Sequence, residues 1–526
     1  MQLDLMEQKH QESSEPKKRK RIKKFETIYR ASSEIKVEIT EKNILKIAEL
    51  ATQHNFEIYL VGGYVRDYFL KRQKKDADFT VVGDAIEFAK IVAEHFHSKV
   101  VSYPRFFTAM VPIGTAEFEF VGTRKEVYLS KSRKPIVSVG TLEDDLKRRD
   151  FTINALAVSL NPDTFGKLID LFDGYQDLHN RMIRTPLDPR ATFDDDPLRM
   201  LRAIRFSAQL DFQIEESTLE AIKEMKNRIE IVSQERITDE LMKIIDSPIP
   251  SKGFILLFTT GLLEKIFPEL FELSGVETIE ENGVQYSHKD VFLHSLKVLD
   301  KVAENTDNTW LRFTALLHDI GKAKTKRFIP KVGWSYHGHE EIGARMVPNI
   351  FRRLKLPIDK VEYVEKLVRL HQRPMALVDD GVTDSAIRRL AAYAGDALED
   401  LFLLCRCDIT TNNPNLSKKY LNNYTKVWKK VLKVQEKDKL RQFQSPVRGE
   451  EIMEIFGLQP SPEVGVIKIA IEEAILDGII QNDYADAKRF VLERKEAWKK
   501  LLETINVREI KKDKDLIKKL FDYSTG

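Results

Sequence analysis

Residues 60–78, LVGGYVRDYFLKRQKKDAD, determine the fold of the N-terminal half of the chain. An apolar strand leads into a glycine turn and a short helix, and the carboxylates of Asp76 and Asp78 follow. Side chains two positions apart in a strand point to the same face, so these carboxylates would face one way, about 7 Å apart along the strand. That spacing predicts a site for two divalent metal ions.

The turn in this stretch consists of Gly62 and Gly63, and Arg66 follows in the helix. Glycines remove side chains where backbone N–H groups must approach phosphate oxygens, and the start of a helix favours anions. Together with the paired carboxylates, the turn predicts an enzyme that handles a nucleoside triphosphate.

More motifs follow in a fixed order: RRDFTINAL at 148–156, DGYQDL at 173–178 and DDPLRMLRAIRF at 195–206. With these motifs the chain resembles the class II tRNA nucleotidyltransferase and bacterial poly(A) polymerase superfamily over about residues 46–270. The resemblance implies template-independent addition of CCA to the 3′ end of tRNA from CTP and ATP, with release of pyrophosphate. It also implies Mg²⁺ as the catalytic metal and an RNA recognised largely by the shape and backbone of its acceptor stem.

The third strand of the head, AEFEFVG at 116–122, places Glu117 and Glu119 on one face and two phenylalanines on the other. Glu119 resembles the third acidic residue of related palm domains. A solvent-facing carboxylate is the alternative. Residues 125–140, KEVYLSKSRKPIVSVG, show little periodicity, so we expect a loop beside the site.

The helix in DDPLRMLRAIRF carries Arg199, Arg202 and Arg205 on one side and an apolar stripe on the other. By resemblance, Asp196 and Arg199 read the incoming base, while Arg202, Arg205 and Arg149 contact the nucleotide. Most relatives have Glu-Asp where this chain has Asp195-Asp196, which leaves the base-reading pair unchanged. Cytosine and adenine both present an amino donor beside a ring-nitrogen acceptor, so one carboxylate and one guanidinium would accept both bases and reject uracil and guanine.

A second group of candidate ligands lies in VFLHSLKVL (291–299), LLHDIGK (316–322), YHGHEEIGA (336–344), RLHQRP (369–374) and CRCDIT (405–410). These motifs resemble an HD domain, a helical metal-dependent phosphohydrolase unit. The resemblance implies His294, His318, Asp319 and Asp408 as core ligands, and His339 and His371 as accessory ligands. Imidazole and carboxylate suit a transition metal or magnesium. Metal binding and hydrolysis are separate expectations, and the metal stays open.

Composition sets broader limits. The 526 residues are 42% hydrophobic, which is sufficient for several packed domains, and the net charge is only +3. Any affinity for RNA must therefore come from local patches. We expect a cytoplasmic protein, because no run of about 18 apolar residues would span a membrane and the first residues show no signal region. Cys405 and Cys407 are interpreted as buried thiols.

The fold class expected is α+β, with a mixed β-sheet in the catalytic head and helices thereafter. We divide the chain into a polar and basic extension (1–45), the head (46–179), a helical neck and body (180–270), an HD domain (271–435) and a helical C-terminal domain (436–526). The basic run 17–24, KKRKRIKK, would touch an RNA backbone, imitate a nuclear targeting signal or form a solvated extension. The C-terminal domain would dock RNA or pack on the body.

Three alternatives to CCA addition remain. A bacterial poly(A) polymerase, or a partial enzyme that adds only CC or only A, would carry the same head motifs. An RNA-binding protein with inactive sites is the third alternative, and the intact Asp76, Asp78, Asp196 and Arg199 argue against it. The sequence leaves the oligomeric state open.

Overall fold

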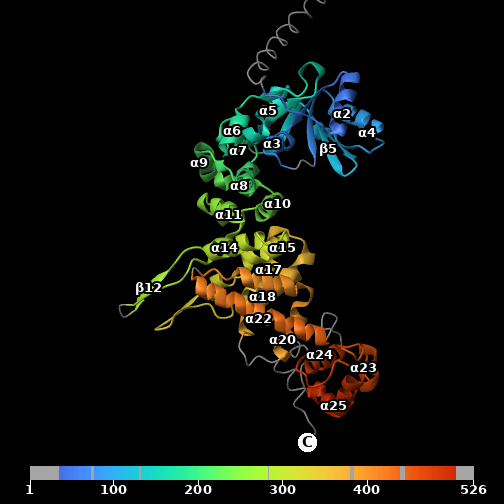
Figure 1. The fold of residues 1–526 in the computed structure, drawn as a ribbon, viewed down its shortest axis with the longest axis vertical. Helices are drawn as coiled ribbons and strands as arrows, with labels where there is room; N and C mark the ends of the chain where they lie inside the picture. The colour runs from blue at the N-terminus through green and yellow to red at the C-terminus, as the bar shows by residue number, and fades with distance from the viewer. Residues whose placement is uncertain are drawn as a thin grey trace, which may run out of the picture. The chain divides into compact units, whose positions relative to one another are not determined.

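The computed structural model describes residues 35–72, 76–129, 132–281, 284–378, 384–411, 413–438 and 445–504 (Figure 1). The basic run 17–24 lies outside the described residues. Two compact units divide the chain, Met1–Pro268 and Glu269–Gly526, and each is described by itself.

A seven-stranded mixed sheet forms the centre of the head. In spatial order its strands are β3 (Val101–Tyr103), β4 (Thr108–Ile113), β5 (Ala116–Gly122), β2 (Ala77–Val82), β1 (Glu57–Val61), β8 (Leu156–Ser159) and β9 (Leu168–Asp170). Only β2 and β5 pair in parallel, and the other neighbours are antiparallel. The expected mixed sheet is confirmed.

Aromatic packing holds the sheet to its covering helices. Phe79 on β2 stacks on Phe120 of β5 at 4.9 Å, and Phe88 contacts Phe120 edge-on at 5.5 Å. Phe88 lies in α4, where the Asp84 carboxylate accepts hydrogen bonds from the first-turn amides. The head helices are α2 (Lys42–Gln53), α3 (Gly63–Phe69), α4 (Ala85–His95), α5 (Leu142–Lys147) and α6 (Gly174–Asn180), with single 3₁₀ turns at Pro104–Phe106, Thr152–Asn154 and Pro162–Thr164.

The prediction of a loop at residues 125–140 is wrong. A β-hairpin lies there, with β6 (Arg124–Leu129) antiparallel to β7 (Ser132–Val139) and a register shift between Val127 and Leu129. The segment lacks alternation but is rich in valine and isoleucine, which favour strands. The register shift also interrupts the two-residue period that is typical of a strand.

Helices follow the head in the first unit, as expected for a neck and body. They are α7 (Pro189–Asp195), α8 (Leu198–Leu210), α9 (Glu216–Met225), α10 (Gln234–Ile245), α11 (Pro250–Thr259) and α12 (Leu262–Ile266), with a 3₁₀ segment at Lys226–Ile231. A short parallel pair, β10 (Met182–Ile183) and β11 (Gln213–Ile214), joins the start of this region to the end of α8. The α13 helix (Pro268–Phe271) spans the boundary between the units.

The second unit is a helical domain with two inserted hairpins. Its helices are α14 (Val291–Ala303), α15 (Thr309–Leu317), α16 (Lys322–Thr325), α17 (His339–Leu354), α18 (Val361–Leu370), α19 (Arg373–Ala376), α20 (Asp384–Ala394), α21 (Leu398–Cys407) and α22 (Pro414–Asp438), with 3₁₀ turns at Ile358–Lys360 and Gly395–Ala397. The hairpins are β12 (Thr278–Glu281) with β13 (Val284–Ser287), and β14 (Arg327–Ile329) with β15 (Gly333–Ser335). The cysteines are free and buried, as expected.

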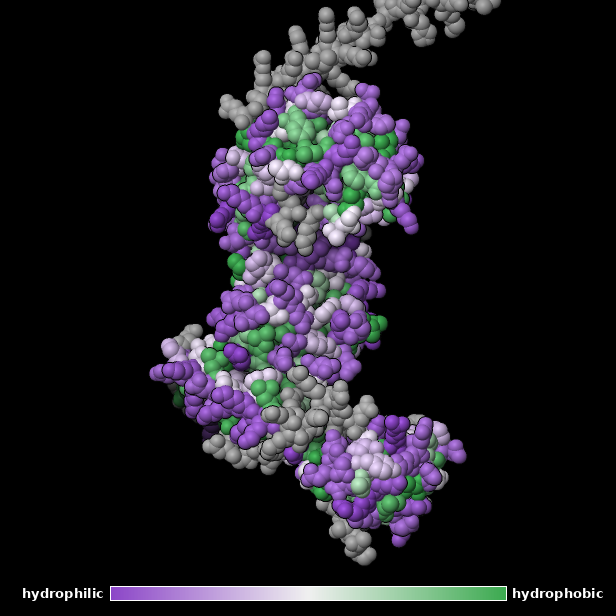
Figure 2. Space-filling model, turned by 45° about the vertical axis from the view of Figure 1, so that its right-hand side comes forward, coloured by the Kyte–Doolittle hydropathy of each residue, from purple (hydrophilic) through white to green (hydrophobic). Residues whose placement is uncertain are grey.

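The C-terminal helices α23 (Gly449–Phe456), α24 (Pro462–Leu476) and α25 (Tyr484–Thr504) share a separate apolar core around the fully buried Trp498. Figure 2 shows hydrophilic residues over most of the visible face, with smaller hydrophobic patches between them. Among the described residues, no helix is both long and apolar enough to cross a bilayer.

Candidate functional site

The sheet register places acidic residues side by side in the head. Asp78 on β2 lies opposite Glu119 on the parallel strand β5, so their side chains leave the same face of the sheet. Asp76 precedes β2, and its carboxylate accepts a hydrogen bond from the backbone N–H of Glu117 at 3.1 Å. The structure therefore brings the three predicted acidic residues to adjoining positions of two strands.

The Asp78 carboxylate lies in surroundings that disfavour an isolated negative charge. Burial raises the pKa of Asp78; Arg149 opposes that rise, Asp76 adds to it, and Arg66 opposes it more weakly. A cation would stabilise such a group, which fits a metal ligand. Within the described residues, the oxygens of Asp76, Asp78 and Glu119 do not all come within 4.8 Å of one another. Their role as a metal site stays a prediction.

Gly62 allows a close approach that a side chain at this position would disturb. Its φ is +68° and its ψ is −133°, and a Cβ built there would lie 3.0 Å from Nη1 of Arg149 and 3.3 Å from Oδ2 of Asp78. Side chains rarely adopt that backbone conformation. The glycine turn therefore lies directly against a predicted metal ligand and a predicted nucleotide-binding arginine.

A buried carboxylate that sequence analysis missed orients Arg149. Asp145 is fully buried and accepts from Arg149 at 3.1 Å and from Arg148 at 2.6 Å. Burial raises the pKa of Asp145, but the two guanidiniums outweigh burial and hold it below its usual value. Asp145 lies on α5 and stands four residues before Arg149, which follows the end of that helix, and this spacing was the available signal.

A polar chain links the head to the helix α8. Arg66 donates to Oδ1 of Asn154 at 2.9 Å, Asn154 donates to Asp150 at 3.0 Å, and Asp150 accepts from Nε of Arg202 at 2.8 Å. Asp150 and Asn154 belong to the RRDFTINAL motif but were not singled out from the sequence. This series of hydrogen bonds fixes the positions of Arg66 and Arg202 relative to each other.

The ring of Phe206 lies close to the guanidinium groups of three arginines. The guanidinium carbons of Arg66, Arg202 and Arg205 lie 5.1, 5.6 and 4.2 Å from the centre of its ring. Arg205 is buried, and its Nε lies 2.9 Å from Glu240 in an ion pair. Burial lowers the pKa of Arg205 to about 10. Because the Arg205 guanidinium is ion-paired with Glu240, its contact with a nucleotide stays a prediction.

The predicted base-reading pair is not joined in this structure. Asp196 lies between α7 and α8, where one carboxylate oxygen accepts from the N–H of Leu198 at 3.2 Å and the other from Arg236 at 2.9 Å. Arg199 donates to the backbone carbonyl of Arg148. Arg236 lies on α10, which showed only its apolar periodicity in the sequence. Both members of the pair are thus oriented by partners distant in the chain.

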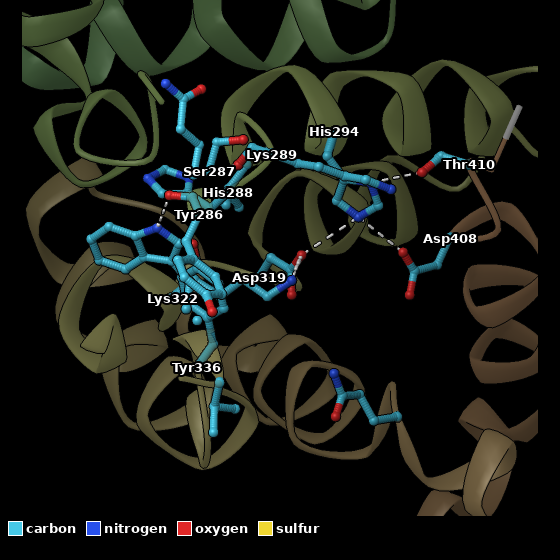
Figure 3. A pocket seen from close by; sticks show the side chains of 16 residues that line it. Tyr286, Ser287, His288, Lys289, His294, Asp319, Lys322, Tyr336, Asp408 and Thr410 are labelled. Carbon is cyan, nitrogen blue, oxygen red and sulfur yellow. Dashed lines mark hydrogen bonds and ion pairs between the residues drawn. The ribbon is translucent and has the colours of Figure 1, made fainter. Parts of the chain in front are cut away.

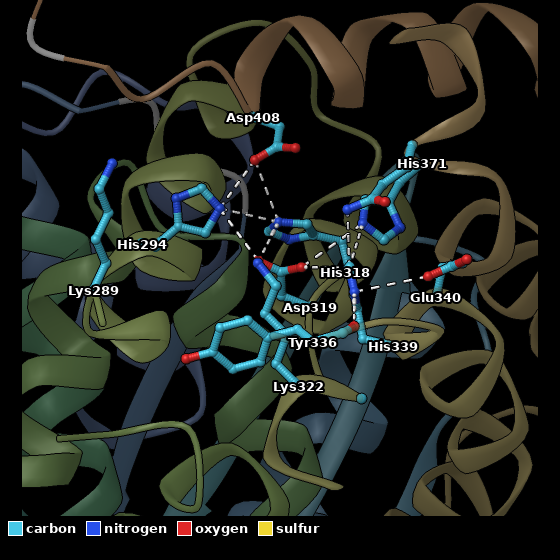
Figure 4. Close-up of polar contacts among 12 residues, drawn as sticks. Lys289, His294, His318, Asp319, Lys322, Tyr336, His339, Glu340, His371 and Asp408 are labelled. Atoms are coloured by element: carbon cyan, nitrogen blue, oxygen red, sulfur yellow. Dashed lines mark hydrogen bonds and ion pairs between the residues drawn. The ribbon is translucent and has the colours of Figure 1, made fainter. Parts of the chain in front are cut away.

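In the second unit, the six predicted HD ligands gather into two clusters (Figure 4). The ligand atoms of each cluster lie within 4.8 Å of one another, and the clusters are His294, His318 and Asp408, and Asp319, His339 and His371. Asp319 also belongs to the first cluster by distance, since its Oδ2 lies 3.4 Å from His318 while its Oδ1 lies 3.2 Å from His339. One carboxylate therefore lies between two candidate metal positions.

The histidine tautomers favour cations at both positions. Nδ1 of His318, His339 and His371 lies 2.8, 2.8 and 2.6 Å from backbone carbonyl oxygens. A carbonyl only accepts, so each Nδ1 carries a proton, and the neutral form of each ring, which a metal selects, has its lone pair on Nε2. Nε2 of His339 lies 3.4 Å from Nε2 of His371, so two lone pairs face each other. A metal ion would satisfy both, so the residues present fit a metal.

The electrostatics of the cluster also favour positive charge. Burial lowers the pKa of His318, but Asp319 and Asp408 outweigh it and raise the pKa to about 10. The Asp319 carboxylate additionally accepts from Lys322 at 2.6 Å. Sequence analysis did not single out Lys322, nor Thr410, whose hydroxyl lies 2.9 Å from Nδ1 of His294. Lys322 and Thr410 are the last residues of the motifs LLHDIGK and CRCDIT, so their closeness in sequence to the ligands was the available signal.

Comparison with known proteins agrees with this geometry. Three family models match: the poly A polymerase head domain over residues 58–184, the probable RNA and SrmB-binding site of polymerase A over 211–273, and the HD domain over 291–413. Head and HD domains of these kinds depend on divalent metal ions.

Two curated relatives illustrate the sequence similarity. A multifunctional CCA protein of Nitrosococcus oceani is 32% identical over 361 residues, which cover 67% of this chain and 84% of that protein. An A-adding tRNA nucleotidyltransferase of Deinococcus radiodurans is 33% identical over 345 residues, covering 63% of this chain and 75% of the relative.

Solved structures share the fold. The apo form II of a CCA-adding enzyme matches with a TM-score of 0.56 at 22% identity, covering 89% of this chain and 98% of that one. The Thermotoga maritima CCA-adding enzyme complexed with tRNA matches with a TM-score of 0.54 at 22% identity, covering 87% and 97%. The chain belongs to the class II tRNA nucleotidyltransferase and bacterial poly(A) polymerase family, is an enzyme of that class, and carries an HD domain.

Proposed function

We propose that the head adds CCA to the 3′ end of tRNA from CTP and ATP, without a template and with release of pyrophosphate. The observation that carries this proposal is the pairing of Asp78 with Glu119 beside Asp76 and the Gly62 turn. The similarity to the multifunctional CCA protein of Nitrosococcus oceani supports the choice of reaction. The proposed place of action is the cytoplasm, where tRNA and nucleoside triphosphates occur.

In this proposal Asp76 and Asp78, with Glu119, hold two Mg²⁺ ions. Bound there, the ions would activate the terminal 3′ hydroxyl and stabilise the pyrophosphate leaving group. Arg66 and Arg149 face the triphosphate, and their orientation by Asn154 and Asp145 reduces the reorganisation needed on binding.

Asp196 and Arg199 select the base. The carboxylate accepts from the amino group of cytosine or adenine, and the guanidinium donates to the ring nitrogen. The Arg236 contact orients the Asp196 carboxylate before the nucleotide arrives. Arg199 must exchange the Arg148 carbonyl for the base, a swap of one hydrogen bond for another.

The test separates CCA addition from its close alternatives, including the A-only reaction that the name of the Deinococcus radiodurans relative describes. Transfer RNAs that lack CCA, or end in C or CC, are each supplied with one labelled nucleotide at a time. Addition of two C and one A, followed by arrest, supports the proposal. Addition of A only, of CC only, or of a long A run selects the corresponding alternative.

We propose a second activity, metal-dependent phosphohydrolysis in the HD domain. The observation that favours it is the pair of ligand clusters with Asp319 between them, because two adjacent metals suit attack on a phosphoryl group. His294, His318 and Asp408 would hold one ion, and His339 and His371 the other. The chemistry supplied by such ions is a nucleophilic hydroxide at neutral pH.

His318→Ala tests this activity. It should lose hydrolysis of 2′,3′-cyclic phosphates or phosphomonoesters and about one equivalent of bound metal by elemental analysis, while nucleotide addition persists. Asp78→Ala is the matched control, since it should lose addition and retain hydrolysis. If the intact protein hydrolyses neither substrate with magnesium, manganese, nickel or cobalt, the HD site has no hydrolytic role.

A further inference from the structure

An open groove of about 610 Å³ lies along α22 in the second unit. Among the described residues, its lining comes from that helix alone and is polar throughout, with Lys418, Lys419 and Lys426 between asparagines. The cavity of the HD site, of about 580 Å³, is lined by other residues, among them Asp319 and Asp408 (Figure 3). The groove is therefore a surface feature separate from the HD site, and none of its described lining residues is acidic.

Six lysines of α22 share one side of the helix. At 3.6 residues per turn they fall within a sector of about 120° and extend over about 22 Å along the axis. Five of them are exposed and Lys430 is half-exposed. We call them the lysine stripe, which consists of Lys418, Lys419, Lys426, Lys429, Lys430 and Lys433.

The lysine stripe concentrates positive charge without compensation. Residues 409–435 hold these six lysines and no acidic residue, whereas the whole chain has a net charge of only +3. None of the six has an ion pair with the residues that the structure describes. A solvated helix face usually carries both signs, and like charges four residues apart, such as Lys426 with Lys430 and Lys429 with Lys433, destabilise a helix. An anionic partner would relieve this repulsion.

The opposite side of α22 is packed inside the second unit. Tyr424, Val427 and Val431 are buried, and the ring centres of Trp428 and Phe402 are 4.8 Å apart. A helix that lies on a membrane inserts its apolar side between the lipids, but this apolar side already packs against protein. The packing therefore directs the lysine stripe to solvent and favours a polyanion over a lipid surface.

The polar residues between the lysines indicate which polyanion fits. Asn415 and Asn422 lie within the same sector of the helix, and Thr425 flanks it. Lysine, asparagine and threonine side chains are common ligands of phosphate and sugar oxygens in nucleic acids. A straight row of cations also complements the regular row of phosphates along one strand.

We propose that the lysine stripe binds the phosphate backbone of RNA without reading its sequence. It lies outside residues 211–273, which match the RNA-binding family model, and it belongs to the second unit. The stripe thus adds a second surface for the RNA to the proposed nucleotide addition, on which this inference rests. It also provides the local basic patch that a chain of nearly balanced charge needs for RNA affinity.

The test measures RNA binding without nucleotides. Fluorescence anisotropy gives the affinity of the full-length protein for a tRNA that lacks CCA, between 50 and 200 mM salt, and the triple variant Lys418→Gln, Lys426→Gln, Lys429→Gln is compared with the wild type. Each lost phosphate contact lowers the slope of log affinity against log salt by about 0.7–0.9 in magnitude. The triple variant should therefore lose about 2–2.7 from the slope, so the affinity advantage of the wild type should shrink about 20–40-fold over this range.

Two control variants separate the lysine stripe from net charge and from folding. Arginine at the same three positions keeps the charge and should keep the slope. Lys90→Gln, Lys297→Gln, Lys355→Gln removes the same charge from exposed lysines on α4, on α14 and after α17, and should also keep the slope. The glutamine variant of the stripe should unfold at or above the wild-type urea concentration, because it relieves repulsion between lysines. An unchanged slope in that variant, or an equal loss in the scattered variant, overturns the proposal.

Further arms test the kind of partner. A short RNA duplex unrelated to tRNA should show the same loss of slope, because backbone contacts carry no sequence information, and a loss confined to tRNA overturns recognition without sequence. Vesicles that contain phosphatidylserine test the membrane. If the triple variant loses vesicle binding but keeps the RNA slope, the stripe is a membrane surface and the proposal is overturned.

Failure of this inference and failure of the proposed function give different results. A stripe-dependent slope in a protein that adds no nucleotide to tRNA retains the RNA surface and overturns the proposed function. Addition of CCA by a protein whose slope does not depend on the stripe retains the proposed function and overturns the RNA surface.

Discussion

Gly62→Ala should damage both the stability of the head and its chemistry. At φ +68° and ψ −133° an alanine costs about 1–3 kcal/mol of backbone strain. The unfolded chain loses entropy on the same substitution, which returns about 0.4–1 kcal/mol. The expected net loss is therefore about 0–2.6 kcal/mol in the free energy of unfolding, with a central value of about 1.3 kcal/mol.

The new Cβ would also lie 3.0 Å from Arg149 Nη1 and 3.3 Å from Asp78 Oδ2, so one of these groups must move. Arg149 is restrained by Asp145 at 3.1 Å, and misplacement by about 1 Å costs on the order of a hundredfold in rate. A shift of a few tenths of an ångström should lower kcat for nucleotide addition about tenfold.

Urea unfolding and steady-state addition of AMP to a tRNA ending in CC measure the two effects. Gly63→Ala is the matched control for stability, because its Cβ would meet only Nη2 of Arg66 at 3.6 Å, an ordinary contact. It should unfold at or above the wild-type urea concentration. If Gly62→Ala has the stability of Gly63→Ala and the kcat of the wild type, the close packing of Gly62 against Arg149 and Asp78 contributes neither to stability nor to catalysis.

Other predictions follow from the contacts of the head and neck. Arg199→Ala should lower discrimination against UTP and GTP by about 10- to 150-fold in kcat/KM ratios, since a hydrogen bond to a charged group contributes about 1.5–3 kcal/mol; unchanged ratios would contradict base reading. Asp196→Asn should tolerate UTP better than the wild type, because its amide can donate to a keto oxygen, and a uniform loss for all four nucleotides would argue against this. Arg236→Ala should lower the same ratios while changing stability by less than about 1 kcal/mol, because the pair with Asp196 is partly exposed, and Arg236→Lys should restore part of the selectivity. Asp145→Asn should cost about 3 kcal/mol at neutral pH, since it leaves two arginines without their buried partner. The pKa of Asp145 is lowered in the folded state, so its contribution to stability is present above the usual pKa of 3.8 and is lost as the pH falls below that value. The difference in unfolding free energy between the wild type and the variant should therefore shrink from pH 5 to pH 3. A constant difference would refute the assignment.

Among the strands of the head, β1 was predictable because it is a continuous apolar run, and β5 because its burial alternates along the chain. Residues 58–61 and 116–122 were expected as strands and correspond to β1 and β5. The hairpin β6–β7 was missed because its register shift interrupts the period. The hairpins of the HD domain were missed because strands of three or four residues are too short for alternation to be recognised.

The residue types of both sites could be inferred from motifs, but their partners could not. Asp196 and Arg236 are 40 residues apart, and only the packing of α8 against α10 brings them into contact. The division of the HD ligands into two clusters depends on which oxygen of Asp319 faces which histidine. Side-chain orientation of this kind follows from tertiary packing, and no spacing along the chain encodes it.

The central claim is that the carboxylates of the head hold the metals for nucleotidyl transfer. Single-turnover addition of AMP to a tRNA ending in CC, compared between the wild type and Asp78→Ala at saturating magnesium, tests it most directly, with tRNA affinity and urea unfolding measured on the same preparations. The account predicts a loss of several orders of magnitude in rate with tRNA affinity nearly unchanged. A folded Asp78→Ala protein that adds AMP at a near-normal rate would contradict it.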